Sequence, residues 1–260
     1  MRCPPFSTRG GSFLENITTI KINERLIVPL DLPNYEEAEA MVHLLSPTVT
    51  YFKVGMELYY AAGRNATNLV KHSKAKIFLD LKLHDIPNTV ARALDQLTEI
   101  GVDMINVHIS GGETMLKAAR EAVETRAAHL GIDRPKLLGV TVLTSISDED
   151  LQQDGYNETV LELVKRRTLL ALECGLDGIV CSPKEAGLVK EVSAGKLFTV
   201  TPGIRLIEAG DDQKRVTTPE VAINGGSDYL VVGRPITQAA DPLAAAREFQ
   251  RIIEEAVKNA

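Results

Sequence analysis

Three ionisable side chains of opposite sign stand close together in the sequence and could do acid–base or electrostatic chemistry. Asp80 and Lys82 follow the strand-like run 76–79, and Asp85 comes shortly after them. Residues two apart on a β-strand point to the same face, so Asp80 and Lys82 are predicted to project together. Moving such charges out of water costs on the order of several kcal/mol per ion. Because active sites collect at strand ends, we interpret this segment as catalytic.

The elements that must position these residues alternate along the whole chain. Near-continuous apolar strands separated by amphipathic helices are typical of a parallel sheet covered by helices. Eight such β/α units in 260 residues predict an α/β protein with a closed (β/α)8 TIM barrel, which typically has about 250 residues. An open doubly wound sheet is the alternative, but no GxGxxG motif follows the first strand. The predicted strands are 25–32, 50–55, 76–83, 104–110, 136–145, 178–182, 198–203 and 229–236, and the predicted helices include 35–45, 89–100, 113–129, 158–174 and 242–257.

Composition narrows the possible function classes and the organisation of the chain. Hydrophobic residues make up 44% and charged residues 25%, as in a folded protein with a sizeable core. The net charge of −6 argues against a nucleic-acid partner. Three cysteines without metal or disulfide spacing predict a reducing, cytoplasmic location, and no apolar run is long enough to span a membrane. Residues 1–24 lack a signal-peptide pattern and are interpreted as an N-terminal arm or cap on a single barrel domain, 25–260.

Polar residues gather at the carboxyl ends of the predicted strands and are scarcer at the opposite ends. In a TIM barrel these carboxyl ends form one rim, and the active site is built there. The two longest loops, 147–157 and 204–217, would reach the same rim. The polar rim residues are Asp31, Lys53, Asp80, Lys82, Asp85, Asn106, His108, Thr144, Ser145, Cys181, Ser182, Arg205 and Arg234.

Two glycine–arginine combinations at the ends of the last two strands predict a phosphate site. Gly203 and Gly233 would let backbone N–H groups approach an anion closely. Arg205 and Arg234 carry planar guanidinium groups that match phosphate oxygens. Each motif alone could be a turn with a solvated arginine. Their position after strands seven and eight, where barrels often bind phosphate, favours the phosphate site.

The other candidate residues have simpler structural explanations beside the functional ones. Lys53 and the 80–85 charges alternate in sign, which keeps each group ionised. A salt-bridge network that fills the barrel is the alternative, although barrel interiors usually hold branched apolar side chains. His84 and His108 fit hydrogen-bonded core histidines, and Cys181 fits a small buried hydrophobe because no base is paired with it.

These motifs resemble those of the orotidine 5′-phosphate decarboxylase family, of the bacterial type. The most specific one is the segment 80–89, Asp-Leu-Lys-Leu-His-Asp-Ile-Pro-Asn-Thr. The sequence departs from the family pattern at Leu206, where a proline is usual. Further similar segments follow in the family's order within residues 25–255, namely 52–55, 107–112, 141–145, 201–205, 212–219 and 232–235.

The resemblance implies a cofactor-free and metal-free decarboxylation of orotidine 5′-monophosphate to uridine 5′-monophosphate, in de novo pyrimidine biosynthesis. Lys82 would donate a proton to C6 of the pyrimidine, with Asp80 beside the departing carboxylate and Lys53 holding Asp80 and the ribose. Asp85 would complete the array from the neighbouring subunit of a homodimer with shared active sites. The implied substrate-binding residues are Asp31 and Lys53 at the ribose, Thr144 and Ser145 at the pyrimidine, Arg205, Gln213, Gly233 and Arg234 at the phosphate, and Ile86 and Thr89 from the neighbouring subunit.

Two other functions stay open on the sequence alone. A related decarboxylase or aldolase that acts on a sugar phosphate shares the Asp-x-Lys-x-x-Asp core but uses magnesium held by additional carboxylates. The segment 86–89 and the Thr144–Ser145 pair favour the pyrimidine enzyme. A non-catalytic sensor of phosphate ligands on the same fold would not need the proton donor Lys82.

Overall fold

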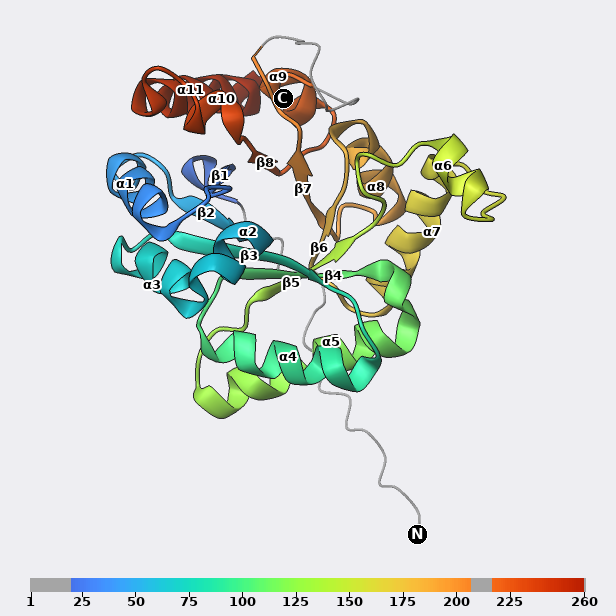
Figure 1. Ribbon diagram of the computed structural model, residues 1–260. Helices are drawn as coiled ribbons and strands as arrows, with labels where there is room; N and C mark the ends of the chain where they lie inside the picture. The colour runs from blue at the N-terminus through green and yellow to red at the C-terminus, as the bar shows by residue number, and fades with distance from the viewer. Residues whose placement is uncertain (1–19, 207–216, 260) are drawn as a thin grey trace.

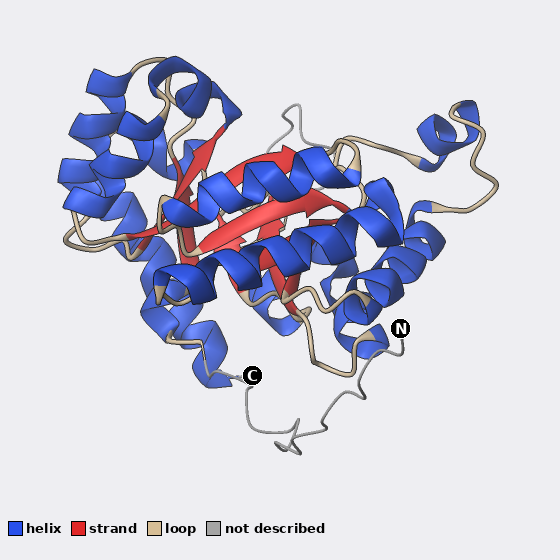
Figure 2. Ribbon diagram, turned by 90° about the horizontal axis from the view of Figure 1, so that it is seen from below, coloured by secondary structure: helices blue, strands red, loops and turns tan. Residues whose placement is uncertain are grey.

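The computed structural model describes residues 20–206 and 217–259, and the remaining residues lie outside the described part. Within the described residues, eight parallel strands pair in sequence order and close into a barrel. Helices surround this barrel on its outer side (Figures 1 and 2). The prediction of a TIM barrel is therefore confirmed. The strands are β1 (Leu26–Pro29), β2 (Tyr51–Gly55), β3 (Lys76–Leu83), β4 (Met104–His108), β5 (Lys136–Val140), β6 (Gly178–Val180), β7 (Phe198–Pro202) and β8 (Tyr229–Val231).

The helices predicted from periodicity are present, with bounds that differ from the predicted ones by no more than two residues. No helix within residues 20–206 and 217–259 is long and apolar enough to cross a membrane. The helices are α1 (Tyr35–Leu45), α2 (Met56–Ala62), α3 (Arg64–His72), α4 (Pro87–Glu99), α5 (Gly112–Leu130), α6 (Asp148–Gln153), α7 (Val160–Glu173), α8 (Ala186–Val192), α9 (Pro219–Asn224), α10 (Arg234–Thr237) and α11 (Pro242–Asn259), with short 3-10 helices η1 (Ile22–Glu24), η2 (Ile109–Gly111) and η3 (Pro183–Glu185).

Several predicted strands were too long at their carboxyl ends. The strand predicted over 136–145 ends at Val140, and the one predicted over 229–236 ends at Val231. Apolar residues continue past both ends because Val142 is buried against the cavity at the rim and Ile236 is buried in α10. A continuous apolar run therefore does not mark where the backbone leaves the sheet.

The acidic segment 147–157, which is expected to be a loop, contains a helix. Helix α6 begins with a capping box, in which the Ser147 hydroxyl accepts a hydrogen bond from Asp150 N and the Asp150 carboxylate accepts one from Ser147 N. This Ser-x-x-acid spacing is a helix-start signal that could have been read from the sequence. Helix α6 lies away from the barrel axis, beyond α7 (Figure 1).

Below the carboxyl ends of the strands, the barrel interior is filled by apolar and aromatic side chains. These residues come from seven of the strands and form one buried cluster, called here the interior layer. A packed interior confines any cavity to the carboxyl ends of the strands. The interior layer consists of Ile27, Tyr51, Phe78, Met104, Leu138, Val200, Tyr229 and Val231.

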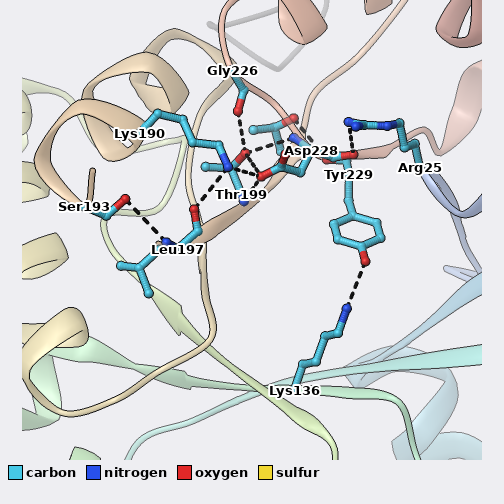
Figure 3. A network of polar contacts seen from close by, with 10 residues as sticks. Arg25, Lys136, Lys190, Ser193, Leu197, Thr199, Gly226, Asp228 and Tyr229 are labelled. Atoms are coloured by element: carbon cyan, nitrogen blue, oxygen red, sulfur yellow. Dashed lines mark hydrogen bonds and ion pairs between the residues drawn. The ribbon is translucent and has the colours of Figure 1, made fainter. Parts of the chain in front are cut away.

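Three aspartates join neighbouring strands at the amino ends of the barrel. Each directly precedes an even-numbered strand and accepts a hydrogen bond from the second backbone N–H of the strand before it. Figure 3 shows one of them, Asp228, whose carboxylate contacts both Thr199 and Lys190. The N···O distances are 2.8 Å for Ile77 and Asp103, 2.7 Å for Leu137 and Asp177, and 2.8 Å for Thr199 and Asp228.

Candidate active site

Three polar side chains at the centre of the candidate site continue the barrel interior above the interior layer. Lys53 on β2, Asp80 on β3 and Asn106 on β4 each lie two positions after a member of that layer on the same strand. Alternation along a strand therefore turns all three inward. Their exposed fractions are 8%, 7% and 0%. Polar groups buried to this degree require hydrogen-bond or ion-pair partners. Asp80 contacts both Lys53 and Asn106, so the three side chains provide partners for one another.

Four charged side chains of alternating sign, called here the charge array, run across the first three strand ends. Lys53 Nζ lies 2.9 Å from Asp31 Oδ1 and 3.3 Å from Asp80 Oδ2. Lys82 Nζ lies 2.7 Å from Asp80 Oδ1. The structure thus brings Asp31, after β1, and Lys53, on β2, together with Asp80 and Lys82 of β3.

The charge array holds its buried members in their ionised forms. Burial opposes ionisation of Asp80, but the ammonium groups of Lys53 and Lys82 outweigh it and lower the pKa of Asp80 below its ordinary value. Burial likewise opposes the charge on Lys53, and Asp80 and Asp31 together raise the pKa of Lys53 above its ordinary value. The site therefore presents fixed charges at neutral pH.

The backbone of β3 is distorted at Lys82. Leu79 pairs with Ile105 and Leu83 pairs with Val107, so β3 uses four residues where β4 uses two. Lys82 has a φ of 51°, in the left-handed region that is unfavourable for a residue with a side chain. The bulge, rather than the simple alternation assumed from the sequence, determines the direction of the Lys82 side chain.

The residues after β3 lie outside the charge array of their own chain. Asp85 is exposed, and its carboxylate accepts a hydrogen bond from Ile86 N at 2.7 Å. Asp85 forms no ion pair with any residue that the structure describes. Ile86 is 67% exposed, and Thr89, in the first turn of α4, is exposed as well. The described chain by itself therefore leaves these three residues available at its surface.

The two histidines near the rim differ in their exposure. His84 is exposed and His108 is half-buried, with ring centroids 5.5 Å apart. Burial, together with the electrostatic effect of the neighbouring His84 and Lys82 side chains, lowers the pKa of His108. The core interpretation is wrong for His84, because the chain leaves the barrel directly after β3 ends at Leu83.

A cavity of about 300 Å³ opens at the carboxyl ends of the strands. The charge array lines it from β1–β3, and Gly203, Arg205, Gly233 and Arg234 line it from the last two strand ends. A pocket of this size, with an apolar lining and few convergent polar groups, suits a small organic ligand. Its apolar lining includes Phe78, Val140, Val142, Val180, Cys181 and Val231.

Comparison with known proteins settles the family. The sequence model described as "Orotidine 5'-phosphate decarboxylase / HUMPS family" matches residues 24–249. The chain belongs to this family. The prediction made from the 80–89 motif is therefore confirmed.

Individual relatives of the orotidine 5′-phosphate decarboxylase family match over nearly their whole length. A protein of Moorella thermoacetica named orotidine 5′-phosphate decarboxylase is 46% identical over 93% of this chain and 97% of its own. One of Carboxydothermus hydrogenoformans with the same name is 47% identical over 90% of this chain and 97% of its own. The crystal structure of orotidine 5′-phosphate decarboxylase from Lactobacillus acidophilus is similar with a TM-score of 0.79 and 38% identity, covering 88% of this chain and 99% of that one.

The residues expected to bind substrate fall into three groups. Within the described residues, six of them line the cavity and three do not, while Gln213 lies outside the described part. The exposed position of Ser145 follows from the early end of β5, after which the backbone turns away from the barrel. The lining members are Asp31, Lys53, Thr144, Arg205, Gly233 and Arg234, and the others are Ser145, Ile86 and Thr89.

The two glycines of the expected phosphate site are needed for different reasons. Gly203 has a φ of 83°, a conformation that side chains rarely adopt. Gly233 has an ordinary φ, but a Cβ there would lie 3.2 Å from Cγ of Pro29. The positive φ therefore favours glycine at position 203, whereas at position 233 a side chain would crowd Pro29 where the ends of β8 and β1 approach each other.

Two features of the site have no predicted role in the sequence. Asn106 stood among the polar rim residues without an assigned contact, although it hydrogen-bonds Asp80 at 2.7 Å. The apolar residues that line the cavity are predicted only as part of the strand core. Its signal is positional, because Val140 on β5 follows Leu138 of the interior layer by two residues and so faces the cavity.

The predicted burial of Cys181 is confirmed. The side chain is 1% exposed, and burial raises the pKa of its thiol. A buried thiol that stays protonated is a poor nucleophile. Cys181 therefore contributes to the cavity wall as a small apolar group.

Proposed function

We propose that the chain decarboxylates orotidine 5′-monophosphate to uridine 5′-monophosphate, without a cofactor, in de novo pyrimidine biosynthesis. The names of its relatives support this activity. The observation that carries the proposal is the Lys82–Asp80 pair, at 2.7 Å, in a cavity that also contains two arginines. Such a cavity suits a phosphorylated substrate whose reacting carbon develops negative charge.

Lys82 acts as the general acid. Breaking the bond between C6 and the carboxylate leaves an electron pair on C6, in the plane of the ring, where it is poorly delocalised. The ammonium group of Lys82 stabilises this developing charge and then transfers a proton to C6. Lys82 is left as a neutral amine and regains its proton from solvent. The array that orients its ammonium group is formed before substrate binds, so little reorganisation is needed.

Asp80 lies beside the departing carboxylate of the substrate. Its lowered pKa keeps it negatively charged, so it repels the substrate carboxylate in the ground state, and this repulsion is relieved as CO2 leaves. Lys53 contacts Asp80 at 3.3 Å and Asp31 at 2.9 Å. In the proposed complex Lys53 holds Asp80 in place, and Asp31 and Lys53 bind the ribose.

The remaining contacts hold the two ends of the nucleotide. Thr144 and Ser145 bind the pyrimidine in the proposal, and Thr144 lines the cavity. The phosphate is held by Gly233 and by a set that also includes Gln213. Binding energy from the phosphate keeps the reacting atoms aligned with the charge array. The phosphate-binding set is Arg205, Gln213, Gly233 and Arg234.

We propose that the active form is a homodimer with shared sites. Asp85, Ile86 and Thr89 are exposed and lie outside the charge array of their own chain, which fits a role in the neighbouring subunit's site. The expected cytoplasmic location is part of the same proposal, supported by the free, buried Cys174 and Cys181.

One assay distinguishes this proposal from its alternatives. The purified protein is mixed with orotidine 5′-monophosphate, and its decarboxylation is followed spectrophotometrically with and without a metal chelator. Turnover that is unchanged by the chelator supports the proposal. Loss of turnover with the chelator supports the magnesium-dependent sugar-phosphate enzyme, and binding without turnover supports a sensor. Residues 20–206 and 217–259 contain no group of three or more His, Cys, Asp or Glu arranged to hold a metal ion.

A further inference from the structure

We propose that Asn106 is a positioning residue that sets the relative placement of Lys82 and Asp80. The inference rests on the catalytic roles proposed for these two residues. Asn106 touches both of them and is completely buried on β4. Its Nδ2 donates a hydrogen bond to Asp80 Oδ1 at 2.7 Å, and its Oδ1 accepts one from Lys82 N at 2.8 Å.

The orientation of the Asn106 amide is determined by its partners. A backbone N–H can only donate a hydrogen bond, and an ionised carboxylate can only accept one. The amide oxygen must therefore face Lys82 N, and the amide nitrogen must face Asp80. Aspartate has the same shape but lacks the donor, and leucine lacks both groups. Among side chains of this size, asparagine alone satisfies both partners.

The bond to Lys82 compensates for the break in the strand ladder. The register between β3 and β4 is interrupted from Leu79 to Leu83, so the Lys82 backbone has no regular strand partner there. A partly buried N–H group needs another acceptor, and Asn106 provides it. This contact supports the left-handed φ of 51° at Lys82, which would otherwise be unfavourable.

The bond to Asp80 selects the oxygen that contacts the proposed proton donor. Asp80 Oδ1 accepts hydrogen bonds from both Asn106 Nδ2 and Lys82 Nζ, each at 2.7 Å. Oδ2 is left to contact Lys53. Lys82 is thus connected to Asn106 twice, directly through its backbone and through Asp80 at its ammonium group. A rotation of the Asp80 carboxylate would move the Lys82 ammonium away from the reacting carbon.

The first test replaces Asn106 by alanine. The Asn106→Ala variant is expected to lose about 10- to 100-fold in kcat, the loss that corresponds to one hydrogen bond to a charged group. Its affinity for uridine 5′-monophosphate is expected to stay close to the wild-type value, because the arginines of the proposed phosphate site are unchanged. A folded Asn106→Ala variant with wild-type kcat overturns the proposal.

A matched variant separates positioning from general loosening of the barrel. Met104 lies two residues earlier on β4, in the apolar interior layer. Met104→Ala creates a cavity and destabilises the protein without touching the Asn106 contacts. Both variants are assayed well below their melting temperatures. A large loss of kcat in Asn106→Ala alone supports the proposal, whereas equal losses in both variants overturn it.

The second test, Asn106→Asp, keeps the shape and the acceptor for Lys82 N. It also places a second carboxylate against Asp80, and two adjacent carboxylates share a proton with a raised apparent pKa. When the pair holds one proton, that proton can replace the lost N–H donor. The kcat of Asn106→Asp is therefore expected to fall with rising pH through this apparent pKa, on a limb absent from the wild type.

The same coupled titration has a readout that needs no turnover. Carboxyl carbon NMR of the Asn106→Asp variant should show an aspartate pair that titrates above the ordinary range. An Asn106→Asp variant with no such titration and with the wild-type pH profile overturns the proposal even if Asn106→Ala fails to fold. Wild-type turnover is measured separately, so failure of the proposed function is distinguished from failure of this inference.

Discussion

Asp80 connects the two lysines of the charge array through its two carboxylate oxygens. Oδ1 contacts Lys82 Nζ and Asn106 Nδ2, and Oδ2 faces Lys53 Nζ. Burial alone would favour the neutral acid, but these cationic neighbours lower its pKa instead. The negative charge that the proposed mechanism requires is therefore maintained by the protein before substrate binds.

At the residue scale, Lys82→Ala is expected to abolish turnover. The variant lacks the proposed proton donor, and the expected loss in kcat is at least about 10²- to 10⁴-fold, the range of general acid catalysis. Binding of uridine 5′-monophosphate, measured by calorimetry, should persist. The control is Lys117→Ala, which removes an exposed lysine paired with Glu113 on α5. Near-normal kcat in Lys82→Ala contradicts the mechanism.

Arg234→Ala is expected to affect only substrates that carry a phosphate. A charge-assisted hydrogen bond contributes about 1.5–3 kcal/mol, so kcat/KM for orotidine 5′-monophosphate should fall by about 10- to 100-fold. The truncated nucleoside orotidine cannot make this contact, and its kcat/KM should change little. The comparison is made with Arg251→Ala, a surface arginine of α11. Equal losses for both substrates would show that Arg234 does not bind phosphate.

At the scale of elements, the aspartates before β4, β6 and β8 keep adjacent strands in register at the end of the barrel opposite the cavity. Asp177 is the most heavily bonded of the three, with Arg134 at 2.6 and 2.7 Å and Leu137 N at 2.7 Å. Burial opposes its charge, but Arg134 outweighs burial and lowers the pKa of Asp177. The strands that carry the site are thus tied together far from it.

Asp177→Asn is expected to destabilise the barrel in a pH-dependent manner. At pH 7 the free energy of unfolding should fall by about 2–3 kcal/mol, as for a lost charge-assisted hydrogen bond. A carboxyl with a lowered folded pKa stabilises above its unfolded pKa of about 3.9. That contribution is lost as pH falls through the folded pKa, so the two proteins should converge in acid.

Urea unfolding at pH 7 and near pH 3 measures this convergence. The matched control is Asp95→Asn on α4, a half-exposed carboxylate with a 3.8 Å contact to Arg126 and a 3.3 Å hydrogen bond from Gln96 Nε2. Its effect should stay within about 0.5 kcal/mol at both pH values. A difference between wild type and Asp177→Asn that does not change with pH would refute the electrostatic explanation.

At the scale of the whole molecule, the described chain forms only part of the proposed active site. The charge array is internal to one chain, whereas Asp85 and Ile86 face solvent beside it. A two-fold dimer would place the same segment of each chain against the other, because such an interface uses the same surface on both subunits. The proposed site would then be complete only in the dimer.

Mixing two inactive variants tests the shared site. Lys82→Ala and Asp85→Ala are each expected to be inactive, but a hybrid dimer of the two contains one site with both wild-type residues. Random pairing in a two-fold dimer leaves about a quarter of the sites intact, so partial activity should return on mixing. Mixing Lys82→Ala with a Lys82→Ala/Asp85→Ala double variant is the control and should stay inactive. No recovery despite demonstrated subunit exchange would contradict the shared site.

Local patterns in the sequence determined the barrel, its strand order and the rim that carries the site. Alternation explains why Lys53 and Asp80 face inward, and strand order explains why the charged and arginine-bearing ends share one cavity. The motif 80–89 further determined the family. These features depend on residue types and short spacings, which a single sequence displays directly.

The tertiary structure alone decided how the charged groups meet. The bulge at Lys82, its contact with Asn106 on another strand and the joining of Asp31 to Lys53 depend on pairing between segments more than twenty residues apart. The residues at which β5 and β8 end also could not be predicted from the sequence. Val142 beyond β5 and Ile236 in α10 beyond β8 are apolar and buried like strand residues. The sequence shows which side chains are apolar or charged, whereas the contacts between them form only when the barrel closes.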